Sequence, residues 1–153
     1  AANAKRANTK RVYFLERGLD LNDPDDYKLG MINFKKDTLG NISHYSRIQK
    51  KKGFYVKLII QMKQNAIYIE IRNNAVVTKV ELMRIHDKLI HVQQYTSLED
   101  ALSRVLDSSE GAGLGLVIVN LMLRKIGLNE DCFDILATEQ ETIARIVIPP
   151  ESA

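Results

Sequence analysis

The chain has 153 residues, of which 45% are hydrophobic and 27% charged, and its formal net charge is +3. This length and composition are those of one ordinary globular domain with room for a hydrophobic core. No apolar run approaches the roughly 18 residues that a membrane-spanning helix needs. Cys132 is the single cysteine, which excludes an internal disulfide and a cysteine-rich zinc site. We therefore expect a cytoplasmic protein without a membrane span, and we expect no signal peptide in residues 1–11, which lack an apolar core.

Positive charge gathers at the start of the chain and again in the run Lys50–Lys52. A basic tail can bind nucleic acid or an anionic lipid surface. The modest net charge and the lack of interleaved aromatic residues favour a solvated tail instead. We expect residues 1–10 to form a disordered basic tail, and residues 11–150 to form the domain. The apolar run Arg11–Leu15 is typical of a short edge strand.

The stretch Leu21–Asp26 has the pattern of a helix start. Asn22 or Asp23 can cap the helix, Pro24 suits its first turn, and the aspartates that follow complement the helix dipole. Apolar residues at helical spacing continue this helix to about residues 46–49.

Two hairpins are predicted farther along the chain. Residues 53–74 contain two β-rich runs that flank Lys63–Asn65, and a second pair of runs covers 132–137 and 142–148. Between the hairpins, helices are expected over 80–95, from a capping box at Ser97–Asp100 to about 106, and over 114–126. This order predicts an α+β fold, a two-layer sandwich whose mixed, mostly antiparallel sheet is covered on one face by helices.

A glycine-rich loop precedes the last of these helices, with the spacing Gly111-x-Gly113-x-Gly115. The spacing fits neither the dinucleotide-binding fingerprint nor the phosphate loop that ends in Lys-Ser/Thr. The unpaired amides at the start of a helix from Leu114 can bind phosphate. The alternative is a glycine turn that lets an apolar helix approach the sheet closely, and the loop by itself favours neither interpretation.

Asp37 and Asn41 stand four residues apart on the first predicted helix, so their side chains share one face. A carboxylate and an amide in this arrangement suit magnesium held through water, or a polarised water beside phosphate. An exposed pair that is merely solvated is the alternative.

Together the two stretches resemble the histidine-kinase-like ATPase (GHKL) superfamily with its Bergerat ATP-binding fold, which includes sensor histidine kinases, anti-sigma-factor serine kinases, gyrase B and MutL. The family helix reads E-x-x-x-N followed by A-x-K-H-S/T, and "DTLGNISHYS" matches it from Asp37 to Ser46. The family loop reads G-x-G-L-G-L, and "GAGLGLVIV" matches it from Gly111 to Val119. The resemblance covers about residues 24–148.

The resemblance implies roles for individual residues. Asn41 would be the magnesium ligand, and Asp37 would take the place of the glutamate that orients the attacking water or hydroxyl, which makes it the catalytic residue. Residues 78–109 would form the ATP lid. The residues expected to contact the nucleotide are Asn41, His44, Tyr45, Asn73, Val77, Gly111, Gly113, Leu114, Gly115, Leu116 and Thr142.

The chain departs from the family at the adenine-binding box. The family has D-x-G-x-G where this chain has Asn73 to Val77, "NNAVV". Asn73 is neutral where the family has an aspartate, and Ala75 and Val77 lack the backbone freedom of glycine. His44 stands where a lysine is usual, so a fixed positive charge becomes one that titrates near neutral pH.

Two hypotheses follow from the resemblance. The first is a serine/threonine protein kinase that uses ATP and magnesium to phosphorylate a small antagonist protein, as in the anti-sigma-factor kinases and SiaB-like partner-switching regulators of bacteria. The second is a catalytically degenerate module that acts through protein–protein contacts. The expected partners are a regulatory protein of the antagonist or sigma-factor type and, as a homodimer, a second copy of the chain. Nucleic acid is not an expected partner.

Overall fold

The computed structural model describes residues 1–92, 95, 97, 99–100 and 114–150. The helices are α1 (Ala2–Glu16), α2 (Pro24–Gly40), α3 (Ile42–Lys51), α4 (Lys79–Val92) and α6 (Leu114–Lys125), with a short 3-10 helix over Glu130–Cys132. The strands are β1 (Val56–Lys63), β2 (Ala66–Asn73), β3 (Phe133–Ala137) and β4 (Thr142–Ile148). In the described part of the chain, no helix is long and apolar enough to cross a membrane.

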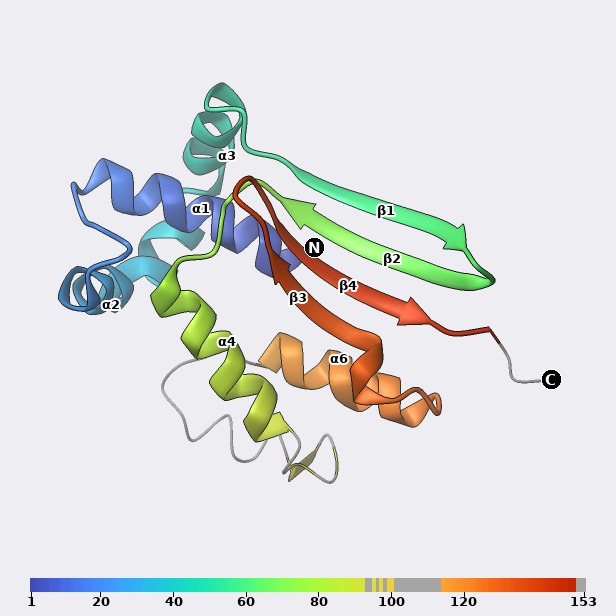
Figure 1. Ribbon diagram of the computed structural model, residues 1–153. Coiled ribbons are helices and arrows are strands. Elements are labelled where there is room, and N and C mark those ends of the chain that lie inside the picture. Colours follow the sequence, from blue (N-terminus) through green and yellow to red (C-terminus); the bar gives the residue numbers. More distant parts are fainter. Residues whose placement is uncertain (93–94, 96, 98, 101–113, 151–153) are drawn as a thin grey trace.

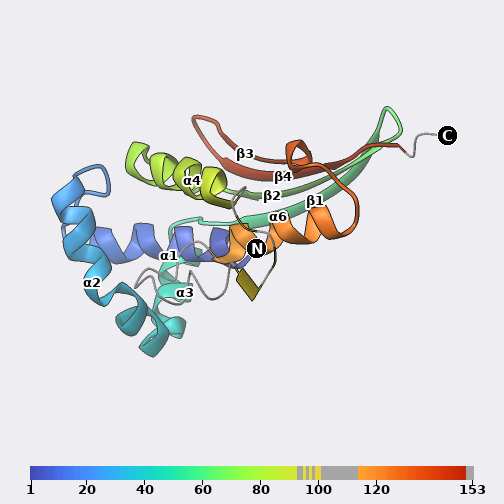
Figure 2. The same ribbon diagram turned by 90° about the horizontal axis from the view of Figure 1, so that it is seen from below.

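The four described strands form one antiparallel sheet in the order β1-β2-β4-β3 (Figure 1). Gln64 and Asn65 connect β1 to β2 with positive φ angles of 50° and 61°, as a two-residue hairpin turn requires. In Figure 2 the sheet is seen nearly edge-on, with α1, α3 and α6 on the same side of it. The α+β class, the antiparallel sheet and both predicted hairpins are therefore confirmed.

The start of the chain is helical, and this corrects the sequence prediction. Residues 2–10, expected as a disordered tail, are the first turns of α1, and Arg11–Leu15 belongs to the same helix rather than to an edge strand. Val12, Tyr13 and Phe14 are at most 1% exposed and form the main core cluster with aromatic residues of α2 and α3. Because other elements surround this part of α1, three consecutive residues are buried. Such an apolar run has the pattern of a strand when it is read locally.

The helix predicted from residue 24 begins as expected but ends early. The Asp23 side chain caps α2 by accepting hydrogen bonds of 2.9 Å from the amides of Asp25 and Asp26. Asn41 leaves the helical conformation with φ −135° and ψ 36°, so the expected single helix becomes α2 and α3. The Thr38 hydroxyl donates to the carbonyl of Phe34 at 2.6 Å in the last turns of α2, a contact that bends helices.

The start of α4 is anchored to α1. Thr78 and Glu81 exchange hydrogen bonds between side chain and amide at 3.2 and 3.1 Å, which is a capping box. The Glu81 carboxylate also forms ion pairs with Lys10 at 2.8 Å and with Arg11 at 2.6 Å. The predicted helix over 80–95 is confirmed as far as Val92, where α4 ends.

Candidate functional site

Asp37, the predicted catalytic carboxylate, lies against the C-terminal end of α1. Its Oδ2 accepts a hydrogen bond from the Tyr13 hydroxyl at 3.0 Å and pairs with Arg17 at 2.8 Å. The Arg17 guanidinium carbon lies 3.5 Å from the centroid of the Tyr13 ring. Burial and the hydrogen bond to Asp37 raise the pKa of the Tyr13 hydroxyl, which keeps it a donor at neutral pH. The Oδ1 atom of Asp37 has no hydrogen-bond partner among the described residues.

Asn41 lies one turn farther along, where α2 gives way to α3. Its Nδ2 donates to the carbonyl oxygen of Asp37 at 2.9 Å, and the residue is exposed. This hydrogen bond fixes which end of the amide faces the helix. The Oδ1 atom is left without a described partner, and this oxygen is of the type that magnesium prefers.

His44 and Tyr45 follow on the first turn of α3. His44 Nε2 lies 2.9 Å from Glu16 Oε1, and its ring meets the Tyr45 ring edge to face with centroids 5.1 Å apart. The predicted motif residues Asp37, Asn41 and His44 therefore lie close to the C-terminal end of α1 and its C-cap residue Arg17. His44 has a carboxylate partner and remains partly exposed to solvent.

The second group of predicted residues meets the middle of α1. The Asn73 amide, 4% exposed, donates to Asn8 Oδ1 at 3.3 Å and to the carbonyl of Ala75 at 3.2 Å. Thr142, the strand partner of Asn73, accepts from the Val77 amide at 3.0 Å and donates to the same Ala75 carbonyl at 2.9 Å. Asn73, Val77 and Thr142 thus lie together.

The third group lies at the start of α1. A Cβ atom added to Gly115 would come within 3.0 Å of the Asn3 side chain, so α6 begins against the first turn of α1. Leu116 is half-buried on the same helix. Leu114 is the first residue of α6, and Gly111 and Gly113 lie outside the described residues.

These groups are spread along α1 rather than gathered at one point. Asn3 and Tyr13 are ten residues apart, which corresponds to about 15 Å along a helix at 1.5 Å per residue. The Asp37–Asn41–His44 group and the Asn73–Val77–Thr142 group are each assembled by the fold. Among the described residues, Gly115 and Leu116 are not brought to either group.

Sequence reasoning missed the α1 residues that complete the first group. Tyr13, Glu16 and the C-cap residue Arg17 are spaced i, i+3 and i+4, so they share a helix face that contacts α2 and α3. The signal that could have found them is the helical spacing of Ala4, Asn8 and Val12, all of which are buried. A prediction of strand over Arg11–Leu15 concealed this spacing.

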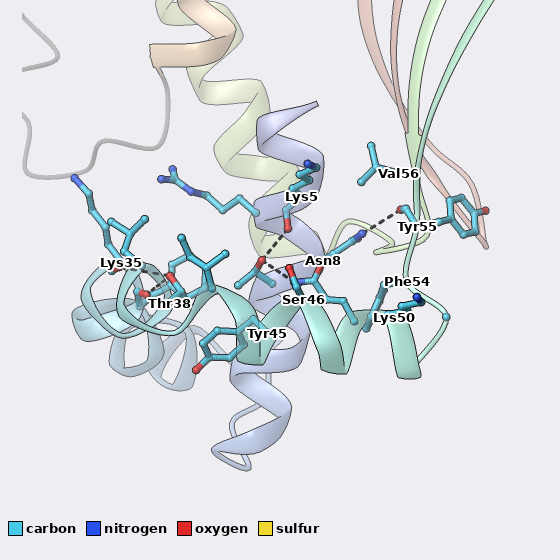
Figure 3. Close-up of a pocket in the computed structure, with 17 residues that line it drawn as sticks. Lys5, Asn8, Lys35, Thr38, Tyr45, Ser46, Lys50, Phe54, Tyr55 and Val56 are labelled. Carbon is cyan, nitrogen blue, oxygen red and sulfur yellow. Dashed lines mark hydrogen bonds between the residues drawn. The ribbon is translucent and has the colours of Figure 1, made fainter.

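A cavity of about 590 Å³ lies beside the first group, between α1, α2, α3 and the segment that leads into β1. Of the predicted site residues that the structure describes, only Tyr45 lines it. Figure 3 shows that Lys5, Lys35 and Lys50 stand on three different helices around it, while the ring of Tyr55 points away. Within the described residues there is no group of three or more histidine, cysteine, aspartate or glutamate side chains that could hold a metal ion.

Comparison with known proteins gives one relative. A protein of Treponema pallidum (strain Nichols) with the description "Uncharacterized protein" is 51% identical to this chain over 147 residues. The match covers 96% of this chain but 29% of the relative, so the chain spans less than a third of the relative's length. No protein-family model and no solved structure matches the chain.

Proposed function

We propose that the chain is an ATP-binding regulatory domain of the histidine-kinase-like type, acting as a magnesium-dependent serine/threonine protein kinase on a small antagonist protein. One observation carries the proposal: Asp37 and Asn41, one helical turn apart, each keep a side-chain oxygen that has no partner among the described residues. These are the two oxygens that the proposed chemistry uses.

In this proposal Asn41, Asp37 and Arg17 have different roles. Magnesium-bound ATP supplies the phosphoryl group. The Oδ1 of Asn41 offers an oxygen ligand to the ion, and the Oδ1 of Asp37 orients and accepts the proton of the attacking hydroxyl. Arg17, held 2.8 Å from Asp37, supplies the permanent positive charge that His44 gives only when it is protonated.

Titration with magnesium-ATP tests the proposal. Asn41→Ala is expected to weaken the magnesium-dependent part of binding by at least about tenfold, or ~1.4 kcal/mol, since it removes the ligand oxygen. Asn33→Ala is the matched control, because Asn33 is an exposed amide on the same helix without a described partner, and it should bind as the wild type does. Circular dichroism shows whether each variant is folded.

Two results would count against the proposal. Absence of saturable binding by the folded wild type at millimolar magnesium-ATP would overturn the kinase function. Equal affinities of Asn41→Ala and Asn33→Ala would overturn the role of Asn41 as magnesium ligand.

A second candidate function is a partner-binding module without nucleotide turnover. Asn73 favours it, because a neutral amide replaces the family's aspartate and is buried, with its Nδ2 held by Asn8 and by the carbonyl of Ala75. The family uses this position to accept a hydrogen bond from adenine. A folded chain that binds no nucleotide, and that purifies with a regulatory protein, is the outcome this candidate expects.

A further inference from the structure

The cavity between α1, α2 and α3 is strongly positive. Lys5, Arg6, Lys35 and Lys50 line it, and the described lining residues include no aspartate or glutamate. None of the four cations forms an ion pair with a described residue. Four like charges around one cavity repel one another, and an anion between them would relieve that repulsion.

The neutral polar groups of the wall are already used within the protein. Gln49 donates to the Thr9 hydroxyl at 2.9 Å, and the Asn8 amide donates to the Tyr55 carbonyl at 3.0 Å. The Thr38 hydroxyl donates to a carbonyl of its own helix at 2.6 Å. These hydrogen bonds fix the wall, so the charged side chains and the exposed Ser46 hydroxyl remain to meet a ligand.

The same cavity has an apolar part. Leu39 and Ile42 line it while each is 61% exposed, and the half-buried Phe54 lies in the wall near Lys50 (Figure 3). Aliphatic side chains left in water beside cations that have no described ion-pair partner match a ligand that is anionic at one end and apolar at the other.

We propose that this cavity binds an organic phosphate of about nucleotide size, a phosphate group carried on a ring or an apolar chain, and that it does so without magnesium. A phosphate group has up to two negative charges and three acceptor oxygens, so it can meet cations from three helices at once. The volume of about 590 Å³ lies within the ~300–1,000 Å³ of small-molecule sites. The site is separate from the proposed kinase function, because Asp37 and Asn41 do not line the cavity.

Calorimetric titration in EDTA tests the charged part. The probes are adenosine monophosphate, a soluble short-chain phosphatidate and inorganic phosphate. Lys35→Gln/Lys50→Gln removes two lining cations, and Lys36→Gln/Lys51→Gln removes two exposed cations from the neighbouring positions, outside the cavity. The first double variant should bind the organic phosphate about tenfold or more weakly, since charged hydrogen bonds are lost, while the second stays within about twofold of wild type.

The two double variants are closely matched. Both lower the net charge by the same amount, and Lys50 and Lys51 both lie in the last turn of α3, where a cation stabilises the helix end. Equal weakening in both variants would show general attraction of anions to a positive surface and would overturn the proposal. Absence of binding of both organic probes by the folded wild type would also overturn it.

A second arm tests the apolar part. Leu39→Ser should weaken binding of the organic probes and leave inorganic phosphate unchanged, whereas Ile32→Ser, at an exposed position of α2 outside the cavity, should change neither. The preference between the nucleotide and the phosphatidate identifies the source of the phosphate. Binding that requires magnesium and is lost in Asn41→Ala belongs to the proposed kinase site, and it would contradict the cavity as the binding site.

Discussion

The ion cluster of Glu81 gives the sharpest prediction of stability. Glu81 is 8% exposed, and its carboxylate binds Lys10 and Arg11, whose side chains are 13% and 12% exposed. The Arg11 guanidinium also donates to the carbonyl of Val76. The change Glu81→Gln removes the negative charge but preserves the capping box, since glutamine serves at this position as well as glutamate does. The variant therefore isolates the charge from the helix cap.

The magnitude follows from the pKa of Glu81. Burial alone would raise this pKa, but the hydrogen bond from Arg11 and the charges of Lys10 and Arg11 outweigh burial and lower it from 4.5 to about 2. At 1.36 kcal/mol per pH unit this difference corresponds to about 3 kcal/mol of stability. Loss of one partner from a buried ion pair costs a similar amount, ~3–5 kcal/mol.

The sign of the pH dependence follows from the lowered pKa. The stabilisation is complete above the unfolded pKa of 4.5 and is lost as the pH falls toward the folded pKa of about 2. At pH 7 we expect the free energy of unfolding of Glu81→Gln to be about 3 kcal/mol lower than that of the wild type. At about pH 3 this difference should fall to roughly half.

Urea denaturation followed by circular dichroism, at a series of pH values, measures both effects. Glu139→Gln is the matched control, because Glu139 is exposed in the turn between β3 and β4 and should change stability by less than ~0.5 kcal/mol. A deficit below ~1 kcal/mol for Glu81→Gln at pH 7 would refute the ion-pair argument, and so would a deficit that does not change with pH.

Two further variants test the packing and the sheet. Gly30→Ala should lower the free energy of unfolding by ~1–3 kcal/mol, because the added Cβ would collide with the buried ring of Phe14. Gly40 has open space at the Cβ position, so Gly40→Ala should raise the free energy of unfolding by up to ~1 kcal/mol. Chemical denaturation measures both, and equal effects would contradict the close packing at Gly30. Glu70 is 1% exposed, and its carboxylate pairs with Arg72 at 2.6 Å and with Arg145 at 2.7 Å. We expect Glu70→Gln to lower the free energy of unfolding by about 2 kcal/mol. This loss is smaller than the one expected for Glu81→Gln, because both arginines keep contact with water. Burial would raise the pKa of Glu70, but the hydrogen bonds from the two arginines lower it. The loss of stability in Glu70→Gln should therefore be present above the ordinary pKa of glutamate and fade in acid. A loss of stability that persists unchanged in acid would contradict the role of these ion pairs.

Elements with a local signal were predicted well. The turn at Gln64 and Asn65, the cap at Asp23 and the end of α6 before Gly127, with φ 79°, each depend on a few neighbouring residues. The break at Asn41 was missed, although Gly40 beside it is a weak helix former. Whether a helix continues through such a residue is decided by packing on both sides, which a local pattern does not contain.

The first group shows why a motif gives only part of a site. Asp37, Asn41 and His44 lie within one short motif and were identified from it. Arg17 is twenty residues upstream, at the C-cap of a helix whose residues 11–15 were expected to be a strand, and it reaches Asp37 only because α1 packs against α2. A family pattern gives the positions that the family shares. The charge that a particular chain places beside those positions is fixed by its tertiary contacts.

This difference bears on the balance between the two functional candidates. A histidine in the usual lysine position, taken alone, indicates a weakened phosphate site, because an imidazole lacks the fixed charge of lysine and His44 pairs with Glu16. Arg17 keeps its charge at every physiological pH and stands beside the carboxylate proposed to orient the hydroxyl. If Arg17 has taken over the role of the lysine, Arg17→Gln should weaken magnesium-ATP binding more than His44→Gln does at the same pH. The reverse order would show that the ion pair of Arg17 with Asp37 serves the structure alone.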